Sequence, residues 1–337
     1  MIVVSLIMME IKQLKAILAI YEYGSFTAAA ESLETVQSNI SAHISKLESE
    51  LNTVLVDRST GQITPAGRIV VDCAKQINFD IENIPRALAT FEDKITGIIK
   101  IGLIGTTASW LVPWLFQQIP KKWPTLKPQY TEGTSYGLEQ ELLDGYLDLI
   151  ITNLPTASAE IISSPLFTED LVLVVDTNHH LAKKRSVSMK ELEELDLLLP
   201  APGTVLRTEI NAAAKKNGVN LSSKSDVNSI RLIASLTFAG SGPAILPATS
   251  IADYLSGKWV GIKITDLNPR TVGIARRNEP LITPSITAII KLLDTDLMAY
   301  KRLPKGVSVH PIKPTLLQRQ SKNRTLRNKN EDSLPPE

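Results

Sequence analysis

The stretch that most constrains the fold runs from Ser25 to Leu51 and reads SFTAAAESLETVQSNISAHISKLESEL. Its apolar residues recur every three or four positions, which is the spacing of one face of an α-helix. Three consecutive alanines leave so little bulk that a neighbouring helix can approach closely. Polar residues gather at the start of the second helix, residues 37–51, where burial alone does not require them. The pattern predicts a helix-turn-helix whose second helix enters the major groove of double-stranded DNA.

The flanking residues complete a small domain over residues 9–67. Apolar residues at helical spacing predict a first helix from Ile11 to about Tyr21, which Gly24 ends, and Ser25 is a candidate N-cap for the next helix. The run VLVDRSTGQITPAGR predicts two short strands around STGQ, a hairpin that resembles a wing.

A heptad pattern follows in residues 68–96. Apolar residues recur at intervals of seven in two interleaved series, which is typical of a coiled-coil seam between two copies of a chain. Pro85 lies inside this predicted helix, and we expect it to kink the helix near residues 81–84. A helix buried against its own domain is the alternative. The expected seam residues are Val70, Ala74, Ile77, Ile81, Ile84 and Leu88.

Residues 97–300 alternate between predicted strands and helices, which indicates an α/β architecture. In such folds, ligands bind beyond the carboxyl ends of the strands. Hydroxyl, amide and arginine side chains follow several predicted strands, and helix N-termini there favour anions. A small-molecule effector, with a carboxylate as one candidate, is therefore expected to bind Thr106, Thr107, Ser109, Ser135, Asn153, Gly203, Thr204, Arg207 and Ser229. For any one Ser or Thr, a role as a helix N-cap is the alternative.

Composition and motifs argue against several other classes of protein. Of 337 residues one is a cysteine, Cys73, so the chain cannot form an internal disulfide. The apolar N-terminus is too short to span a bilayer and lacks the features of a secretory signal, so we expect a cytoplasmic protein without a membrane contact, and a start at Met8 or Met9. The four histidines show no metal-ligand spacing, and no nucleotide-binding or nucleophile motif occurs. We therefore expect no metal, no cofactor and no enzymatic activity.

Charge is distributed unevenly along the chain. Residues 301–337 contain nine Lys or Arg against three Asp or Glu, and we expect this basic tail to be largely disordered. Residues 9–67 contain four Lys or Arg against seven Asp or Glu. Because phosphate neutralisation drives much of the affinity for DNA, one head alone should bind weakly, and a dimer with two heads would offset this weakness.

Several segments in register resemble the LysR-type transcriptional regulators. They are FTAAAESL, Gln37, Ser41, ISKLESEL and VLVDRSTGQITPAG, and the layout continues to about residue 300. The chain departs from the family pattern at Ala42, where an arginine is usual, at Asn52, where a glycine is usual, and at Val56, where a phenylalanine is usual. We take these departures to alter base preference and not to abolish DNA binding.

The resemblance implies a winged helix-turn-helix, a linker helix that dimerises, and an effector domain with two lobes like those of type 2 periplasmic binding proteins. Lobe one is expected at residues 97–164 with 271–300, and lobe two at 165–268. It also implies a homodimer that assembles into a homotetramer, and a contact with RNA polymerase. The expected DNA-binding residues are Thr27, Thr35, Gln37, Ser38, Asn39, Ser41, His43, Lys46 and Arg58.

The sequence thus predicts a ligand-responsive bacterial transcriptional regulator that binds an inverted repeat. The alternative is a cytoplasmic small-molecule binding or scaffold protein whose acidic head contacts another protein. Gln37 is the expected base reader, since an amide pairs in two directions with adenine.

Overall fold

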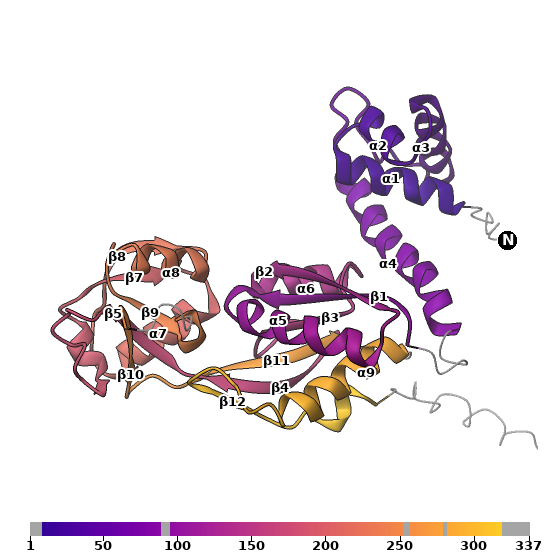
Figure 1. Cartoon of the computed structure of the whole chain (residues 1–337). Coiled ribbons are helices and arrows are strands. Elements are labelled where there is room, and N and C mark those ends of the chain that lie inside the picture. The colour runs from indigo at the N-terminus through magenta and orange to yellow at the C-terminus, as the bar shows by residue number, and fades with distance from the viewer. Residues whose placement is uncertain (1–8, 89–94, 252–256, 279–281, 319–337) are drawn as a thin grey trace, which may run out of the picture. The chain divides into compact units, whose positions relative to one another are not determined.

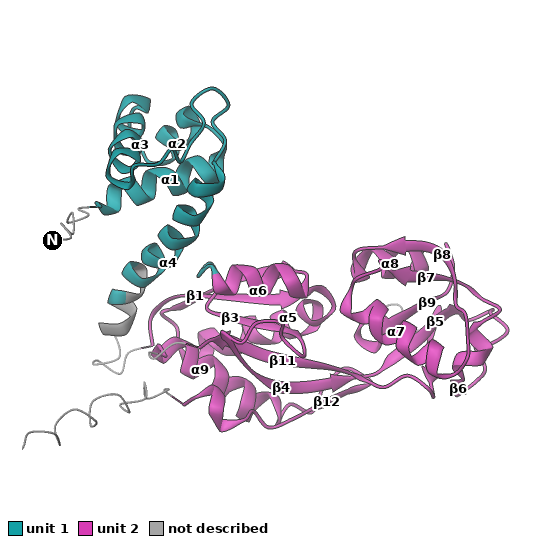
Figure 2. Ribbon diagram, turned by 180° about the vertical axis from the view of Figure 1, so that it is seen from behind, with its two compact units in different colours: residues 1–88, 144–146 teal, residues 89–143, 147–337 magenta. Residues whose placement is uncertain are grey.

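The computed structural model describes residues 9–88, 95–251, 257–278 and 282–318, without the side chains of residues 82, 83 and 85–88. The chain forms two compact units, one of residues 1–88 with 144–146 and one of residues 89–143 with 147–337 (Figure 2). Among the described residues, no helix is both long and apolar enough to cross a bilayer.

The first unit is helical, and we call residues 9–67 of it the head. Its helices are α1 (Ile11–Tyr23), α2 (Phe26–Ser32), α3 (Gln37–Leu51) and α4 (Pro65–Leu88) (Figure 1). Ile17, Ile44 and Leu47 are fully buried in its core. Two of the three alanines of α2, Ala29 and Ala30, also lie in this core, Ala29 completely. The predicted close approach of helices at the alanine run is therefore present.

The helix ends follow the capping residues of the sequence. Gly24 has a φ of 75° at the end of α1, and Ser25 Oγ accepts from the Ala28 amide at 3.1 Å. Asn52 ends α3 with a φ of 49°. Among residues with a side chain, asparagine is one of the few that adopts this left-handed conformation readily, which explains how it replaces the usual glycine there.

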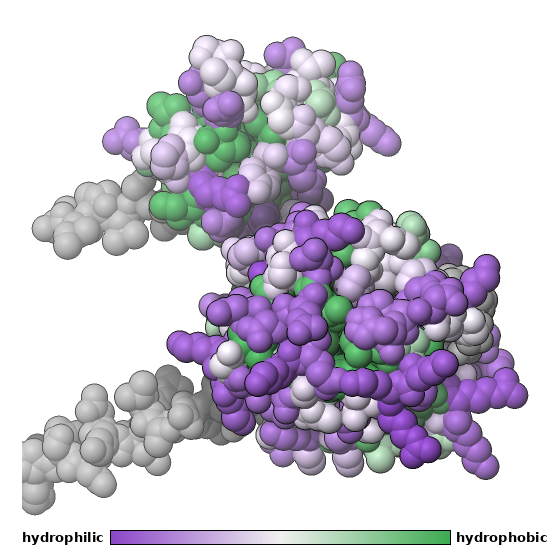
Figure 3. All heavy atoms as spheres, turned by 90° about the vertical axis from the view of Figure 1, so that its left-hand side faces the viewer, coloured by the Kyte–Doolittle hydropathy of each residue, from purple (hydrophilic) through white to green (hydrophobic). Residues whose placement is uncertain are grey.

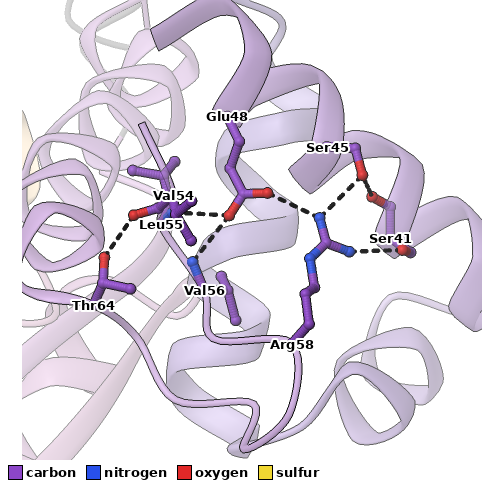
Figure 4. A network of polar contacts seen from close by, with 8 residues as sticks. All are labelled: Ser41, Ser45, Glu48, Val54, Leu55, Val56, Arg58 and Thr64. Atoms are coloured by element: carbon purple, nitrogen blue, oxygen red, sulfur yellow. Dashed lines mark hydrogen bonds and ion pairs between the residues drawn. The ribbon is translucent and has the colours of Figure 1, made fainter. Parts of the chain in front are cut away.

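The wing differs from the prediction of two short strands. It contains one isolated bridge in the described chain, between Val56 and Ile63; residues 58–60 form a turn, and α4 begins at Pro65. Thr64 Oγ1 donates to the Val54 carbonyl at 2.8 Å and helps to hold the two arms together (Figure 4).

The linker helix α4 continues through Pro85 to Leu88 without a break in its helical assignment. Ala74 and Val71 are fully buried in the head core. The heptad pattern therefore reflects packing within the first unit at Ala74, as the alternative interpretation supposed. Ile77 and Ile84 remain exposed, by 38% and 56%. The side chain of Leu88 lies outside the described residues.

The second unit contains two six-stranded sheets, one in each lobe (Figure 1). Lobe one has the strand order β12-β4-β11-β3-β1-β2. Its strands are β1 (Gly97–Ile104), β2 (Leu126–Gly133), β3 (Leu149–Asn153), β4 (Ile161–Glu169), β11 (Arg270–Arg277) and β12 (Val307–Val309). Its α-helices are α5 (Gly105–Lys122), α6 (Ser135–Leu143) and α9 (Pro284–Leu292), followed by the π-helical turn η5 (Leu293–Leu297) and the 3-10 helix η6 (Pro314–Leu316). A methyl group on Gly102 would lie 2.8 Å from Leu138 Cδ2, so glycine lets α6 pack closely on β1.

Lobe two has the strand order β6-β10-β5-β9-β7-β8. Its strands are β5 (Leu171–Asp176), β6 (Ser186–Val187), β7 (Asp196–Pro200), β8 (Ser222–Val227), β9 (Ala244–Pro247) and β10 (Trp259–Ile264). Its helices are η2 (Met189–Leu192), α7 (Val205–Lys216), α8 (Ile230–Phe238) and η3 (Ala248–Ser250). Both sheets mix parallel and antiparallel pairs. The face of this lobe shown in Figure 3 is largely hydrophilic.

Two connections join the lobes. β4 stays in the first sheet up to Glu169, and β5 begins the second sheet at Leu171. The chain returns between Ile264, the end of β10, and Arg270, the start of β11.

The prediction of a largely disordered tail from residue 301 is wrong for residues 301–318. β12 pairs antiparallel with β4, and Ile312 and Leu316 are buried in the core of lobe one. The Lys313 amide donates to Ser164 Oγ at 2.7 Å. Residues 319–337 lie outside the described chain.

Candidate nucleic-acid interface and ligand cavity

The N-terminal half of α3 presents the polar row that the sequence predicts. Gln37, Ser38 and Asn39 are exposed, while Ile40 and Ile44 on the opposite side are buried. The residue before the helix is Val36, whose side chain has no polar group to cap it. The first amides of α3 are therefore left without a side-chain cap, as suits a helix end that approaches phosphate.

The other predicted DNA-binding residues lie on α2, on α3 and in the segments that follow these helices. Thr27 is exposed on α2, and Thr35 accepts from Asn39 Nδ2 at 3.0 Å. Ser41 and His43 are half-buried on α3. Among these residues the structure thus joins Thr35 to Asn39 by a hydrogen bond at the start of α3.

Arg58 reaches from the wing to α3 (Figure 4). It donates to Ser41 Oγ at 2.8 Å, to Ser45 Oγ at 3.0 Å and to Glu48 Oε2 at 2.9 Å. Its guanidinium also lies over the Phe26 ring, 5.3 Å from the ring centre. Arg58 therefore makes its contacts within the head, and these contacts hold the wing against α3.

Glu48 connects the same network to the backbone of the wing. Its Oε1 accepts from the amides of Leu55 and Val56, at 2.8 and 3.1 Å. Burial raises the pKa of Glu48, but the hydrogen bonds from Arg58 and the two amides outweigh burial and hold the pKa below its usual value. The carboxylate is thus ionised at neutral pH and acts as a structural acceptor.

Lys46, another predicted phosphate contact, pairs with Glu10. The Glu10 hydrogen bond raises the pKa of Lys46. Two of the four basic residues of the head therefore have acidic partners, Lys46 with Glu10 and Arg58 with Glu48.

The second candidate site is a cavity of about 630 Å³ in the effector unit. Residues of both lobes line it: Thr106, Ser109 and Tyr130 belong to lobe one, and Phe238 and Thr249 to lobe two. Leu103, Val112, Pro113 and Ala234 add apolar wall. The cavity lies beyond the carboxyl ends of β1 and β2, where an α/β fold is expected to bind its ligand.

Two of the nine predicted effector residues line this cavity, Thr106 and Ser109. Those outside its lining are Thr107, Ser135, Asn153, Gly203, Thr204, Arg207 and Ser229. Thr204 and Ser229 cap α7 and α8, as the alternative interpretation supposed. Arg207 pairs with Asp226 and donates to the Pro200 carbonyl at 2.7 Å.

Sequence reasoning missed Tyr130, Arg231, Phe238, Thr249 and Ser250 in the lining. A signal existed for Thr249 and Ser250, because they lie just beyond the apolar run GPAILP, which ends at Pro247. No comparable signal exists in the sequence for Arg231 and Phe238, which lie within the helix α8.

A buried ion pair lies at the junction of the lobes. Arg270 is 4% exposed and Glu169 is completely buried. Arg270 also donates to Thr106 Oγ1 at 2.6 Å, and Glu169 Oε1 accepts from the Thr249 amide at 2.9 Å. The pair therefore contacts one cavity-lining residue from each lobe.

Comparisons with known proteins agree with this architecture. Residues 11–68 match the family described as "Bacterial regulatory helix-turn-helix protein, lysR family", and residues 92–297 match the "LysR substrate binding domain". The chain is 28% identical over 274 residues to the "DNA-binding transcriptional dual regulator OxyR" of Escherichia coli, covering 80% of this chain and 90% of the relative. It is 31% identical over 285 residues to a "Probable hydrogen peroxide-inducible genes activator" of Mycobacterium leprae, covering 83% and 92%.

Solved structures give the same result. A full-length OxyR from Pseudomonas aeruginosa with a cysteine-to-aspartate substitution has a TM-score of 0.69 at 25% identity, covering 90% of this chain and 98% of that one. CbnR, described as a LysR family transcriptional regulator, has a TM-score of 0.66 at 23% identity, with 85% and 98% covered, which shows the shared fold.

The fold and the two sites define a DNA-binding regulator with a ligand-binding body. The chain belongs to the LysR family of transcriptional regulators, and its function is ligand-responsive control of transcription. Its relatives are regulators, and the chain is not an enzyme.

Proposed function

We propose that Gln37, Ser38 and Asn39 contact DNA from the start of α3, and that DNA binding by the head depends on this exposed polar row. Gln37 is the base reader. Ser38, Asn39 and the uncapped amides contact phosphate, together with Thr27, Thr35 and His43. Arg58 and Ser41 contribute mainly by holding the wing in place, because Arg58 already binds three side chains on α3.

We propose a homodimer as the binding species. The head carries few basic residues, and two of them are paired, so a single head offers little phosphate neutralisation. Exposed isoleucines on α4 supply an apolar surface for a second copy: Ile69 is 67% exposed, and Ile77 and Ile84 are exposed as well. Val70 and Ile81 flank this surface, whereas Ala74 is buried within the head.

The dimer would bind an inverted repeat whose half-sites lie about one helical turn, or a multiple, apart. We also propose that the dimers assemble into a tetramer, that the regulator contacts RNA polymerase and that it is located in the cytoplasm. An effector in the cavity would shift the placement of the heads through different affinities for two assembly states.

Sedimentation of the full-length protein tests the dimer. Ile77→Glu with Ile84→Glu should lower the mass from that of the dimer and weaken DNA binding, because each charge would be buried in the interface. Ile98→Glu is the matched control, since Ile98 is a 42% exposed isoleucine on β1. An unchanged mass in the double variant would contradict the proposed seam.

The names of the relatives raise hydrogen peroxide as a candidate signal. A disulfide needs two cysteines, and this chain has one, Cys73 on α4. We therefore propose that this regulator responds to a bound small molecule and not to a disulfide formed within its effector domain.

A further inference from the structure

One ion pair joins the two lobes at the edge of the cavity. Glu132 lies at the end of β2 in lobe one, and Arg231 lies in the first turn of α8 in lobe two. Arg231 Nη1 donates to Glu132 Oε2. Both side chains line the cavity and are partly exposed to solvent.

This pair lies against the start of α5. A methyl group built on Gly105, the first residue of α5, would meet Glu132 Oε1 at 2.8 Å and Arg231 Cδ at 3.0 Å. The start of an 18-residue helix carries partial positive charge and favours an anion. The Glu132 carboxylate thus occupies the place where a bound carboxylate would be stabilised both by the N-terminus of this helix and by Arg231.

The remaining charge near the cavity is also balanced. Thr106 lines the cavity and accepts from Arg270, but Arg270 is held by the completely buried Glu169. A ligand with an ionised carboxylate would therefore lose its water of hydration without meeting an unpaired cation in the described lining.

Three residues of the lining instead carry buried neutral hydroxyls without a hydrogen-bond partner among the described residues. They are Tyr130 Oη, Thr249 Oγ1 and Ser250 Oγ. Burial raises the pKa of Tyr130 to about 12, so its hydroxyl keeps its proton at neutral pH. A buried polar atom without a partner costs free energy, and a ligand with hydroxyl or amide groups would supply the partners.

We propose that the Glu132 carboxylate occupies the position that a carboxylate of the ligand would otherwise take. The effector is then an uncharged molecule with an apolar body and hydroxyl or amide groups. Leu103, Val112 and Phe238 supply the apolar contacts, and the three unpaired hydroxyls supply the polar ones. The inference rests on the proposed function, in which an effector occupies this cavity.

The test compares benzamide with benzoate, two probes of equal size that differ in charge. The unfolding temperature of the full-length protein is measured against the concentration of each probe, with sodium chloride matching the ionic strength. A ligand that binds the folded state raises this temperature. The variants are Glu132→Gln, which leaves Arg231 unpaired, and Glu160→Gln, an exposed matched control outside the cavity.

Wild type and Glu160→Gln should be stabilised by benzamide more than by benzoate, and Glu132→Gln should reverse this order. Ser235→Trp, which fills the cavity from an exposed position on α8, should abolish both responses. Wild type that prefers benzoate, an unchanged order in Glu132→Gln, or no response to either probe would overturn the inference.

DNA binding by the same variants separates this inference from the proposed function. None of these substitutions lies in the head. If the probe pattern holds but the protein shows no DNA preference, the proposed function fails while the charge assignment stands. Specific DNA binding with the opposite probe order would leave the regulator intact and remove the inference.

Discussion

Arg270 donates to Glu169 Oε2 from both Nε, at 3.0 Å, and Nη2, at 2.5 Å. The two residues are also register partners, at the last position of β4 and the first position of β11. Each strand leaves the first sheet toward lobe two at this point. The pair therefore holds β4 and β11 together at the junction of the two lobes.

Replacing Arg270 with leucine should destabilise the effector unit by about 3–5 kcal/mol, because it leaves Glu169 buried and unpaired. The four tryptophans all lie in this unit, so tryptophan fluorescence in urea follows its unfolding. Arg231→Leu is the control: it breaks a partly exposed pair and should cost at most about 1 kcal/mol. Equal losses in the two variants would contradict the structural role of Arg270.

Glu48→Ala should loosen the wing, because the Leu55 and Val56 amides lose their acceptor at a cost of about 1–3 kcal/mol. Hydrogen exchange of these two amides in the full-length protein measures the effect. Glu31→Ala, an exposed glutamate on α2, should leave their exchange unchanged. Slow exchange in Glu48→Ala would show that Glu48 does not hold the wing.

The same contact predicts a dependence on pH. The pKa of Glu48 is lower in the folded head than its ordinary value of 4.5. Its contribution to stability is therefore complete above that value and is lost as the pH falls through the folded pKa. After correction for the intrinsic exchange rate at each pH, exchange at Leu55 and Val56 should become faster with acid in wild type. In Glu48→Ala it should change little. Parallel profiles would refute the linkage.

Leu316→Ala should cost the effector unit about 2–5 kcal/mol, because Leu316 is completely buried in lobe one. Thr315→Ala, its exposed neighbour in the sequence, should change stability by less than about 0.5 kcal/mol. Tryptophan fluorescence in urea again reports the result. A neutral Leu316→Ala variant would mean that the C-terminal segment is not part of the core.

Hydrogen peroxide should leave DNA binding of the regulator unchanged, because the effector domain contains no cysteine. Binding is measured before and after peroxide treatment, with Cys73→Ser as the control. Loss of binding in wild type alone would assign a redox role to Cys73. Loss in both proteins would indicate oxidation at other residues, such as methionine.

Helical periodicity made the head predictable. The buried stripe of α3, its exposed polar row and the Ser25 cap all follow from local spacing, and the predicted bounds of α3 agree with the structure. The wing was less predictable, because tertiary contacts from Glu48 and Arg58 hold it with a single bridge.

Elements at sheet edges were harder to predict. Five of the six residues of β8, SSKSDV, are exposed, so this strand has no apolar alternation and rests on its pairing with β7. β12 likewise lies at the edge of the lobe-one sheet and depends on its pairing with β4. It belongs to a segment whose charged residues and prolines are typical of a disordered tail. The cavity was only partly predicted, since Arg231 and Glu132 come together from different lobes.

The measurement that tests the central claim most directly is a titration of the full-length protein against DNA from upstream of its own gene. Wild type, Gln37→Ala and the control Gln140→Ala on α6 are compared at two salt concentrations, with a scrambled duplex alongside. We predict specific binding by wild type and Gln140→Ala that weakens with salt, and a loss of about 1–3 kcal/mol in Gln37→Ala at both salts. Wild type that does not distinguish this DNA from the scrambled duplex, and that fails to select any fragment from a genome-wide pool, would contradict the account and favour a head that contacts another protein.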